Sequence, residues 1–258
     1  VESQKKICDF LDKKLLAIDQ LFEAKQNLLG TLSEKRRALI THAVTQGLDP
    51  KAPMRDSGIP WLGKIPAHWE TERTKWVLPE RDERSESGEE ELLTVSHLTG
   101  ITRRSSKDVN MFEAESLEGY KKCEPGDLAI NTLWAWMGAM GVAREPGVIS
   151  PAYNVYKIVP RLDPEFVDLV VRTPRFVEEV TRFSKGVWSS RLRLYPEGLY
   201  EVSFPLPPRS EQHAIVEHIQ LETRKIDNLA AATEGTIALR SEGRRGGTEC
   251  RSRWSPYP

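Results

Sequence analysis

The sequence has few cysteines and no long apolar run. Cys8, Cys123 and Cys250 lie more than a hundred residues apart, so they form neither a zinc knuckle nor a disulfide framework within the chain. No apolar stretch approaches the roughly 18 residues that a membrane-spanning helix needs. The sequence also shows no secretory signal segment, which favours a reducing compartment. These absences predict a cytoplasmic protein without a membrane partner.

An excess of positive charge and a catalytic motif are also absent. The net charge is −1, whereas a nucleic-acid-binding protein is more typically basic. Gly58–Ile65 has the spacing of a phosphate loop, but Ile65 stands where a Ser or Thr would ligate magnesium. His213 and Glu217–His218 do not have the spacing of a zinc-binding helix, and Pro151–Asn154 lacks an accompanying glycine-rich cofactor loop. The sequence therefore predicts no catalytic residue, no metal and no cofactor in this chain.

The sequence does contain a repeat of its first segment near its other end. Gln4–Leu21 reappears, shifted by 208 residues, as Gln212–Leu229, with Ile18-Asp19 matching Ile226-Asp227. Repetition at one large offset is not a solenoid period, which is short and recurs several times. The chain therefore has the organisation of half of a duplicated protein. Its start at Val1 instead of a methionine also suggests a fragment.

Both copies of the repeat have the apolar spacing of a long paired helix. Apolar residues recur in alternating steps of four and three, which is a heptad seam with period 3.5. A helix from about Glu2 to Gln46, ended by Gly47, would be roughly 65 to 70 Å long. Lys14, Lys25 and Lys35 interrupt the seam, which favours a defined antiparallel partner. The alternative is an ordinary amphipathic core helix. The predicted helix-pairing residues are Ile7, Leu11, Ile18, Leu21, Leu28, Leu32, Ile215, Ile219, Ile226 and Leu229.

The region between the copies has the pattern of one α/β domain. Short β-branched or aromatic runs predict four strands, at Glu91–Ser96, Asp127–Asn131, Tyr153–Val159 and Glu201–Phe204. Asp163-Pro164 and Thr173-Pro174 each predict a helix start. We expect Ser210 to cap the second long helix. The predicted organisation is a first long helix (1–48), the α/β (α+β) domain (49–208), the second long helix (209–245) and a tail (246–258).

The tail departs from the repeat. After Arg245 the second copy would continue as Ala-Leu-Ile-Thr, but the sequence reads Gly246-Gly-Thr-Glu and has no apolar period. We expect residues 246–258 to be irregular, and a change of reading frame near residue 240 would explain the departure. A shortened second helix would affect docking to partner subunits.

Several segments together resemble one protein family. Glu34–Pro50, Asp56–Glu70, Leu117–Tyr120, Ser150–Tyr153 and Pro205–Gln212 resemble the specificity subunit of type I restriction-modification systems. The resemblance covers residues 1 to about 240. Members of that family have two target-recognition domains alternating with two conserved helices, which pair as an antiparallel coiled coil. This chain resembles the second half: central helix, second recognition domain and distal helix.

The resemblance implies a non-catalytic subunit that recognises DNA. One domain would read one half of a split double-stranded DNA target, and the coiled coil would set the gap between the halves. Modification subunits would supply S-adenosylmethionine and methyl transfer, and restriction subunits would supply the ATP- and Mg-dependent functions. A half-length chain of this kind suggests a self-dimer. The alternative is a coiled-coil scaffold without DNA-reading activity, and a methyltransferase or nuclease ranks below both.

The candidate DNA-binding residues lie in two basic stretches and beside two predicted strands. Arg and Lys suit phosphate and guanine, Asn suits adenine, and aromatic rings pack on sugars or bases. Core packing is the favoured role of Trp134 and Trp136. We expect both basic stretches to lie on one face, away from the acidic run Glu80–Glu91, because phosphate repels carboxylate. The predicted DNA-binding residues are Arg103, Arg104, Lys107, Asn131, Asn154, Lys185, Trp188, Ser189, Arg191 and Arg193.

Overall fold

The computed structural model describes residues 2–106, 116–188 and 192–253 of the chain. They form two compact units. The helical unit contains residues up to Ala38 and from Gln220 onward, and the α/β unit comprises Leu39–Ile219. The α/β unit covers more of the chain than the predicted domain 49–208, because it includes the end of the first long helix and the start of the second.

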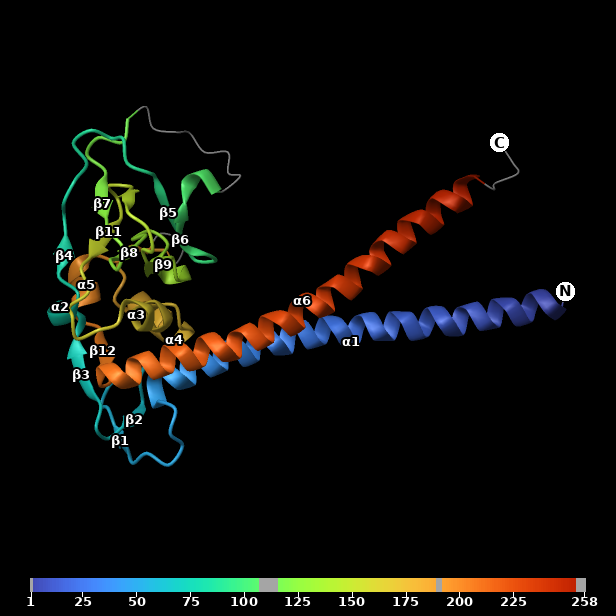
Figure 1. Ribbon diagram of the computed structural model, residues 1–258, viewed down its shortest axis with the longest axis horizontal. Helices are drawn as coiled ribbons and strands as arrows, with labels where there is room; N and C mark the ends of the chain where they lie inside the picture. The colour runs from blue at the N-terminus through green and yellow to red at the C-terminus, as the bar shows by residue number, and fades with distance from the viewer. Residues whose placement is uncertain (1, 107–115, 189–191, 254–258) are drawn as a thin grey trace. The chain divides into compact units, whose positions relative to one another are not determined.

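Figure 1 labels the α-helices in chain order. The helices are α1 (Glu2–Gln46), α2 (Thr74–Val77), η1 (Arg104–Ser106), η2 (Ala135–Met137), α3 (Pro164–Val171), α4 (Pro174–Arg182), α5 (Pro196–Tyr200) and α6 (Arg209–Arg253). The strands are β1 (Met54–Asp56), β2 (Lys64–Pro66), β3 (Glu70–Arg73), β4 (Glu80–Arg81), β5 (Leu93–Ser96), β6 (Gly100–Arg103), β7 (Lys121–Cys123), β8 (Leu128–Ile130), β9 (Met140–Val142), β10 (Gly147–Ile149), β11 (Asn154–Tyr156) and β12 (Ser203–Leu206).

Helix α1 begins and ends where the seam predicts. It has 45 residues, which at 1.5 Å per residue is about 67 Å. Gly47 follows with φ of 75°, and its amide donates to the Ala43 carbonyl at 3.1 Å. A left-handed glycine at this position is a common helix end. The long helix predicted from heptad spacing is therefore confirmed.

Within the helical unit, α1 and α6 run antiparallel. Arg36 forms an ion pair with Asp227, and Lys25 Nζ donates to Thr236 Oγ1 at 2.6 Å. The residue with the lower number on α1 contacts the residue with the higher number on α6. This order confirms the predicted antiparallel direction. Lys25 and Thr236 both interrupt their apolar seams, so the two polar interruptions bond to each other.

The seam is buried only along part of its length. Leu32 and Ile226, beside the Arg36–Asp227 ion pair, expose 8% and 9% of their surface. The remaining predicted pairing residues of the helical unit are exposed in this single chain. They are Ile7, Leu11, Ile18, Leu21, Leu28 and Leu229. Pairing within one chain therefore does not cover them, and their pairing with a second copy stays a prediction.

The expectation of an irregular tail is wrong for residues 246–253. Helix α6 continues to Arg253, so the loss of apolar periodicity after Arg245 does not end it. Each glycine inside a helix costs about 1 kcal/mol relative to alanine, whereas proline is the residue that breaks it. No proline occurs between Pro208 and Pro256. Residues 254–258, including Trp254, lie outside the described residues, and the frame-change interpretation stays a prediction.

The α/β unit is built from antiparallel strand pairs. Its largest sheet has the order β4-β11-β8-β9, and four two-stranded sheets pair β1 with β2, β3 with β12, β5 with β6 and β7 with β10. The pairings of these strands are all antiparallel, and one isolated parallel bridge joins Leu92 to Val148. The predicted α/β (α+β) fold is confirmed in its α+β form. Parallel sheets would have required crossover helices between successive strands.

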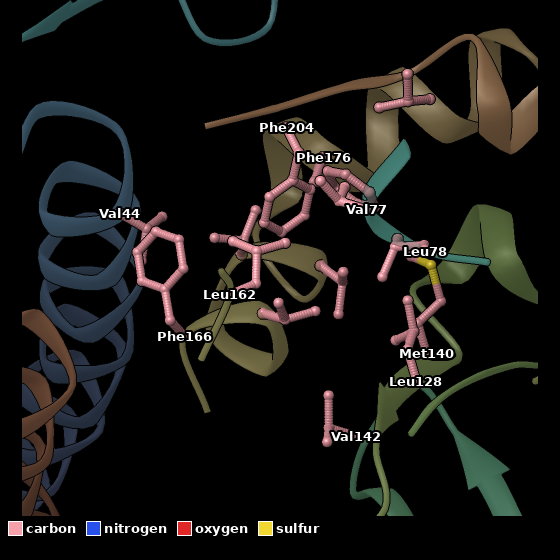
Figure 2. Packing of buried hydrophobic residues seen from close by; sticks show 14 of the residues in the cluster. Val44, Val77, Leu78, Leu128, Met140, Val142, Leu162, Phe166, Phe176 and Phe204 are labelled. Atoms are coloured by element: carbon pink, nitrogen blue, oxygen red, sulfur yellow. The ribbon is translucent and has the colours of Figure 1, made fainter. Parts of the chain in front are cut away.

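Strands and short helices enclose one main apolar core. Phe176 packs edge-on against both Trp61 and Phe204, with ring centroids 5.4 and 5.9 Å apart. Figure 2 shows Phe176 and Phe204 close together, and Phe166 elsewhere in the same cluster. The same cluster includes Ala43 and Val44 of α1, and Ile215, Val216 and Ile219 of α6. The predicted pairing residues Ile215 and Ile219 are therefore core residues of the α/β unit as well.

The start of α6 is fixed to the α/β unit by two polar residues. The buried Gln212 side chain accepts from the Asp163 amide at 2.7 Å and donates to the carbonyls of Arg161 (3.0 Å) and Pro207 (2.8 Å). Glu211 accepts from Trp69 Nε1 at 2.8 Å. The prediction that Ser210 caps this helix is wrong, because α6 already begins at Arg209.

The helix starts predicted at Asp163-Pro164 and Thr173-Pro174 are confirmed. The Asp163 side chain accepts from the amides of Glu165 and Phe166, and Thr173 accepts from Phe176. The predicted strands coincide with β5, β8, β11 and β12. The interpretation of Glu80–Glu91 as a solvated loop is wrong in part, because β4 pairs with β11 and Ser85 is buried.

Candidate nucleic-acid interface

A tight turn after β8 presents Trp134 to solvent. The Trp134 amide donates to the Asn131 carbonyl at 3.0 Å, and the Trp134 carbonyl accepts from the amides of Met137 (3.0 Å) and Ala139 (3.1 Å). Asn131 is 7% exposed, and its Oδ1 accepts from the Leu133 amide at 3.3 Å. The Asn131 side chain therefore shapes this turn, and its role in reading adenine stays a prediction.

The rings of Trp134 and His97 lie against each other. They stack with centroids 6.3 Å apart and an interplanar angle of 25°. His97 belongs to the turn between β5 and β6, so this contact joins two turns that are far apart in the sequence. The favoured core role of Trp134 is wrong, because half of its surface is exposed. Trp136 is half-buried, and its Nε1 donates to the Leu133 carbonyl at 3.0 Å.

The second basic stretch forms a loop closed at its base. Lys185 and Arg193 each donate a backbone N–H to the carbonyl of the other at 2.9 Å. Val187 and Trp188 are exposed, and the Arg193 guanidinium lies 5.4 Å from the centre of the Tyr195 ring. The Leu194 amide donates to the Thr132 carbonyl at 3.0 Å. This bond joins the loop to the turn that carries Trp134. Ser189 and Arg191 lie outside the described residues.

We name the described residues of these three connected segments, 97–100, 131–138, 184–188 and 192–195, the aromatic rim. Acidic residues make up 38 of the 258 residues of the chain, but none of these 21 residues is acidic. The α/β unit has ten large apolar side chains that are described and exposed, and seven of them belong to the rim. Those seven are Leu98, Leu133, Trp134, Met137, Val187, Trp188 and Tyr195.

The other predicted basic stretch does not belong to the rim. Arg103 lies at the far end of β6 from His97, about 10 Å along the strand from Gly100. It forms an ion pair with Glu145, and this hydrogen-bonded carboxylate raises the pKa of the Arg103 guanidinium. Ser105 donates to Glu91 at 2.7 Å. The expectation that this stretch lies away from the acidic run is therefore wrong.

Arg104 and Lys107 are the other two predicted DNA-binding residues of this stretch. Arg104 is half-buried in η1, and its backbone amide donates to the Leu92 carbonyl at 2.7 Å. Lys107 lies outside the described residues. The charge that this stretch offers to DNA is reduced, because Glu145 already neutralises Arg103.

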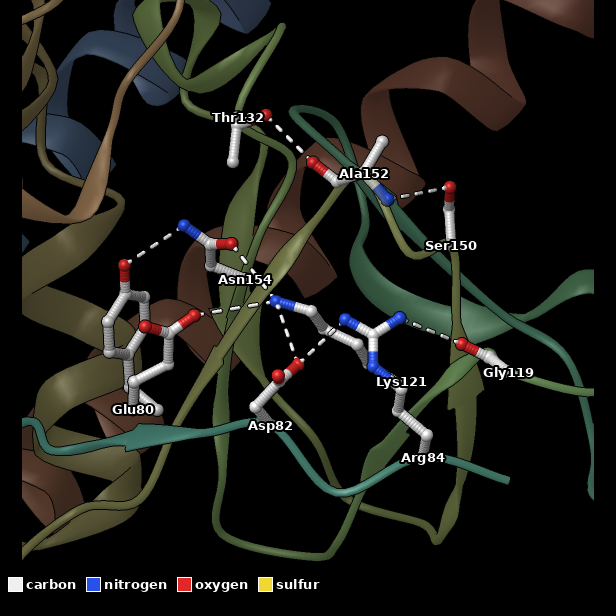
Figure 3. A network of polar contacts seen from close by, with 10 residues as sticks. Glu80, Asp82, Arg84, Gly119, Lys121, Thr132, Ser150, Ala152 and Asn154 are labelled. Carbon is white, nitrogen blue, oxygen red and sulfur yellow. Dashed lines mark hydrogen bonds and ion pairs between the residues drawn. The ribbon is translucent and has the colours of Figure 1, made fainter. Parts of the chain in front are cut away.

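Asn154 belongs to a polar network around a buried lysine. Lys121 Nζ lies 3.4 Å from Glu80 and 3.6 Å from Asp82, and it donates to Asn154 Oδ1 at 3.3 Å (Figure 3). Asn154 Nδ2 donates to Tyr156 Oη at 3.2 Å. Both ends of the amide are therefore occupied within the chain, and the role of Asn154 in reading adenine stays a prediction.

The described residues hold no cluster of metal-binding side chains. Among residues 2–106, 116–188 and 192–253, no group of three or more His, Cys, Asp or Glu side chains is placed to hold a metal ion. A pocket of about 220 Å³ is lined by Gly47, Pro66, His68, Glu211 and Ile215, among others. Within this pocket, His68 Nε2 lies 2.6 Å from Glu211 Oε1. None of the described helices combines the length and apolar character required to cross a membrane.

Comparison with solved structures supports the architecture derived above. No protein-family model matches the chain, and the search of curated sequences gives no match. The HsdS subunit from Thermoanaerobacter tengcongensis has a similar structure, with a TM-score of 0.52, 15% identity, and coverage of 92% of this chain and 53% of that subunit. This chain has the fold of half an HsdS subunit. A chain from a study of complex assembly and conformational transition of the type I R-M system gives a TM-score of 0.58 at 16% identity.

Each match covers most of this chain but only about half of the neighbouring chain. The second match covers 90% of this chain and 55% of that chain. This chain therefore spans about half the length of the HsdS-type chains that it matches. The single α/β unit, flanked by two long helices, agrees with the repeat at the two ends of the sequence. At these identities the likeness shows the fold, and individual site residues have to be argued from their own geometry.

Proposed function

We propose that this chain is a sequence-specific DNA-recognition subunit of a type I restriction-modification complex and reads one half of a bipartite target. The observation that carries this proposal is the aromatic rim on a unit with the HsdS-type fold. Exposed aromatic side chains, Lys185 and Arg193, and the absence of carboxylates suit a surface that contacts both phosphates and bases. The alternative, a scaffold without DNA-reading activity, leaves this composition of the rim without a role.

In this proposal the subunit performs no chemistry itself and acts in the cytoplasm. Modification subunits bind its helices and supply S-adenosylmethionine, and restriction subunits supply the ATP- and Mg-dependent functions. The helical unit supports such docking, since α1 alone exposes eight large apolar side chains there.

Replacing Lys185 by alanine tests the phosphate-binding role of the rim. Lys185 is exposed at the base of its loop, where an ammonium group can reach a phosphate. We expect weaker binding to all duplex sequences alike, and a decrease of about one unit in the slope of log K against log salt concentration. Binding is measured by fluorescence anisotropy over a salt series, on the chain assembled with its modification subunits.

Lys64→Ala is the matched control for this measurement. Lys64 is an exposed lysine on β2, which lies at the other end of the α/β unit from β5 and β6 in Figure 1. Its loss is expected to leave the salt slope unchanged. An equal loss of slope in both variants would indicate a general charge effect and would contradict the rim as the DNA surface. Salt-independent association would instead support the scaffold.

We further propose that the exposed part of the α1 seam pairs with a second copy of this chain. The end-to-end repeat and the half-length coverage of the neighbours support a second copy. Ile18→Lys would place a charge on this seam, so we expect the dissociation constant of the dimer to rise about tenfold or more. Sedimentation equilibrium measures this change. Leu16→Lys, also exposed but off the seam, is the control, and an equal effect of both variants would contradict seam pairing.

A further inference from the structure

The aromatic rim contains an apolar platform formed by Leu98, Leu133, Trp134 and Met137. These side chains expose between 38% and 74% of their surface. Trp134 carries the stacked His97 ring at its side. Exposed apolar side chains that gather in one place on a soluble protein mark an interaction surface more often than isolated ones do. The platform therefore requires a partner with apolar groups of its own.

The platform is held by its own backbone. Trp134 donates one and accepts two hydrogen bonds within the turn. Thr132 lies two residues before Trp134. Its Oγ1 donates to the Ala152 carbonyl at 2.9 Å, which fixes the start of the turn to the chain after β10. Gly138, with φ of 86°, ends η2, and a side chain there would approach Val177 of α4 to 3.2 Å. A surface ordered before binding loses little conformational entropy when it binds.

The charge around the platform favours an anionic partner, such as nucleic acid, over a neutral or basic protein surface. The platform borders the Lys185–Arg193 loop through the bond between Leu194 and Thr132. Arg172 donates to the Leu98 carbonyl at 3.0 Å and lies 3.8 Å from the Asp168 carboxylate, so the positive charge near the platform comes mainly from Lys185 and Arg193. In the major groove of DNA, the main apolar group on a base edge is the C5-methyl of thymine. Cations on the phosphates and an apolar surface on that methyl group are complementary features of one duplex.

We infer that the platform reads pyrimidine C5-methyl groups in the major groove, with Trp134 as the specificity-determining residue. This inference rests on the proposed DNA-recognition function and deepens it. Thymine is the ordinary source of that methyl group, and 5-methylcytosine carries the same one. A platform of this kind distinguishes A·T from G·C pairs by apolar contact, without a hydrogen bond to the base.

Exchange of thymine for uracil isolates the methyl group. The full chain, assembled with its modification subunits, selects duplexes from a library with a randomised centre. The enriched duplex is then synthesised with deoxyuridine for thymidine at each position of the site in turn. Loss of one buried methyl group costs about 0.8 kcal/mol, which is about fourfold in Kd. We expect this loss of affinity at one or more positions, with an unchanged salt slope. Where cytosine in place of thymine weakens binding, 5-methylcytosine at the same position is expected to restore part of the affinity.

Protein variants separate the platform from the phosphate contacts. Trp134→Ala and Leu98→Ala are expected to abolish the difference between thymine and uracil, whereas Lys185→Ala is expected to keep it. Leu98 is 74% exposed, so its loss should not disturb folding. Equal affinity for thymine and uracil at every position, with selective binding retained, would overturn the inference alone. Failure to enrich any sequence would overturn the proposed function as well, and loss of subunit assembly in Trp134→Ala would assign the platform to a protein partner.

Discussion

Replacing Arg81 by methionine is expected to lower the free energy of unfolding of the α/β unit by about 3 to 5 kcal/mol at neutral pH. Arg81 Nε lies 2.8 Å from Asp127 Oδ2, and these side chains expose only 14% and 6% of their surface. Methionine keeps the length of the side chain but leaves the Asp127 carboxylate buried without its cation. Urea unfolding, followed by the fluorescence of the buried Trp61 and Trp69, measures the change.

The loss in Arg81→Met is also expected to depend on pH. Burial raises the pKa of Asp127, and Arg81 opposes this rise, so the variant raises the pKa further. A carboxyl whose pKa is higher in the folded state binds more protons there, and stability falls as pH rises between the unfolded and folded pKa values. The deficit should therefore shrink toward pH values of about 4, near the unfolded pKa of an aspartate.

Arg84→Met is the control for this prediction. Arg84 pairs with Asp82 at 3.0 Å, but both side chains are about half exposed. Exposed ion pairs contribute about 0 to 1 kcal/mol, because water screens them. A deficit in Arg81→Met that is no larger than in Arg84→Met, or that does not change with pH, would contradict the assigned role of the Arg81–Asp127 pair.

Replacing Gln212 by leucine is expected to lower the free energy of unfolding by about 2 to 4 kcal/mol. Leucine has a similar volume but no polar atom. The variant leaves the Asp163 amide and the carbonyls of Arg161 and Pro207 without the partners that Gln212 provides. Buried polar groups without partners lose their hydration and gain nothing in return. Chemical unfolding and hydrogen exchange at the Asp163 amide measure the loss.

Gln26→Leu provides the matched comparison for Gln212. Gln26 is exposed on α1, so its replacement removes a glutamine from a helix without uncovering a buried partner. We expect a change within about 0.5 kcal/mol, as for most surface substitutions. If Gln212→Leu were as mild as this control, water would be satisfying the three backbone groups, and Gln212 would not fix α6 to the α/β unit.

The helical part of the fold follows from local sequence. The alternating steps from Ile7 to Leu39 and the glycine at position 47 are enough to place α1, because helix periodicity and termination depend on neighbouring residues. Asp163-Pro164 and Thr173-Pro174 place α3 and α4 for the same reason. Most two- and three-residue strands, such as β7 and β9, carry too few residues to show a period, so the sequence does not reveal them.

The candidate site was predictable only in part. The composition of Lys185–Arg193 singled out one loop of the rim, and Trp188 is exposed as a binding role requires. The sequence also indicated Arg103, Asn131 and Asn154, whose side chains are occupied by Glu145, by the Leu133 amide and by Lys121 with Tyr156. His97 was missed, because a single histidine between two predicted strands carries no signal. A shared lack of carboxylates in the three loops is the signal that could have found the rim.

The sequence by itself therefore determined the long helices, their antiparallel pairing and the half-duplicated organisation, since each depends on spacing along the chain. Only the tertiary structure decided which polar side chains are free to bind. Arg103 meets Glu145, 42 residues away, and His97 meets Trp134, 37 residues away. A side chain's availability depends on such distant neighbours, because burial and ion pairing are set by strand register and packing, which local sequence does not encode.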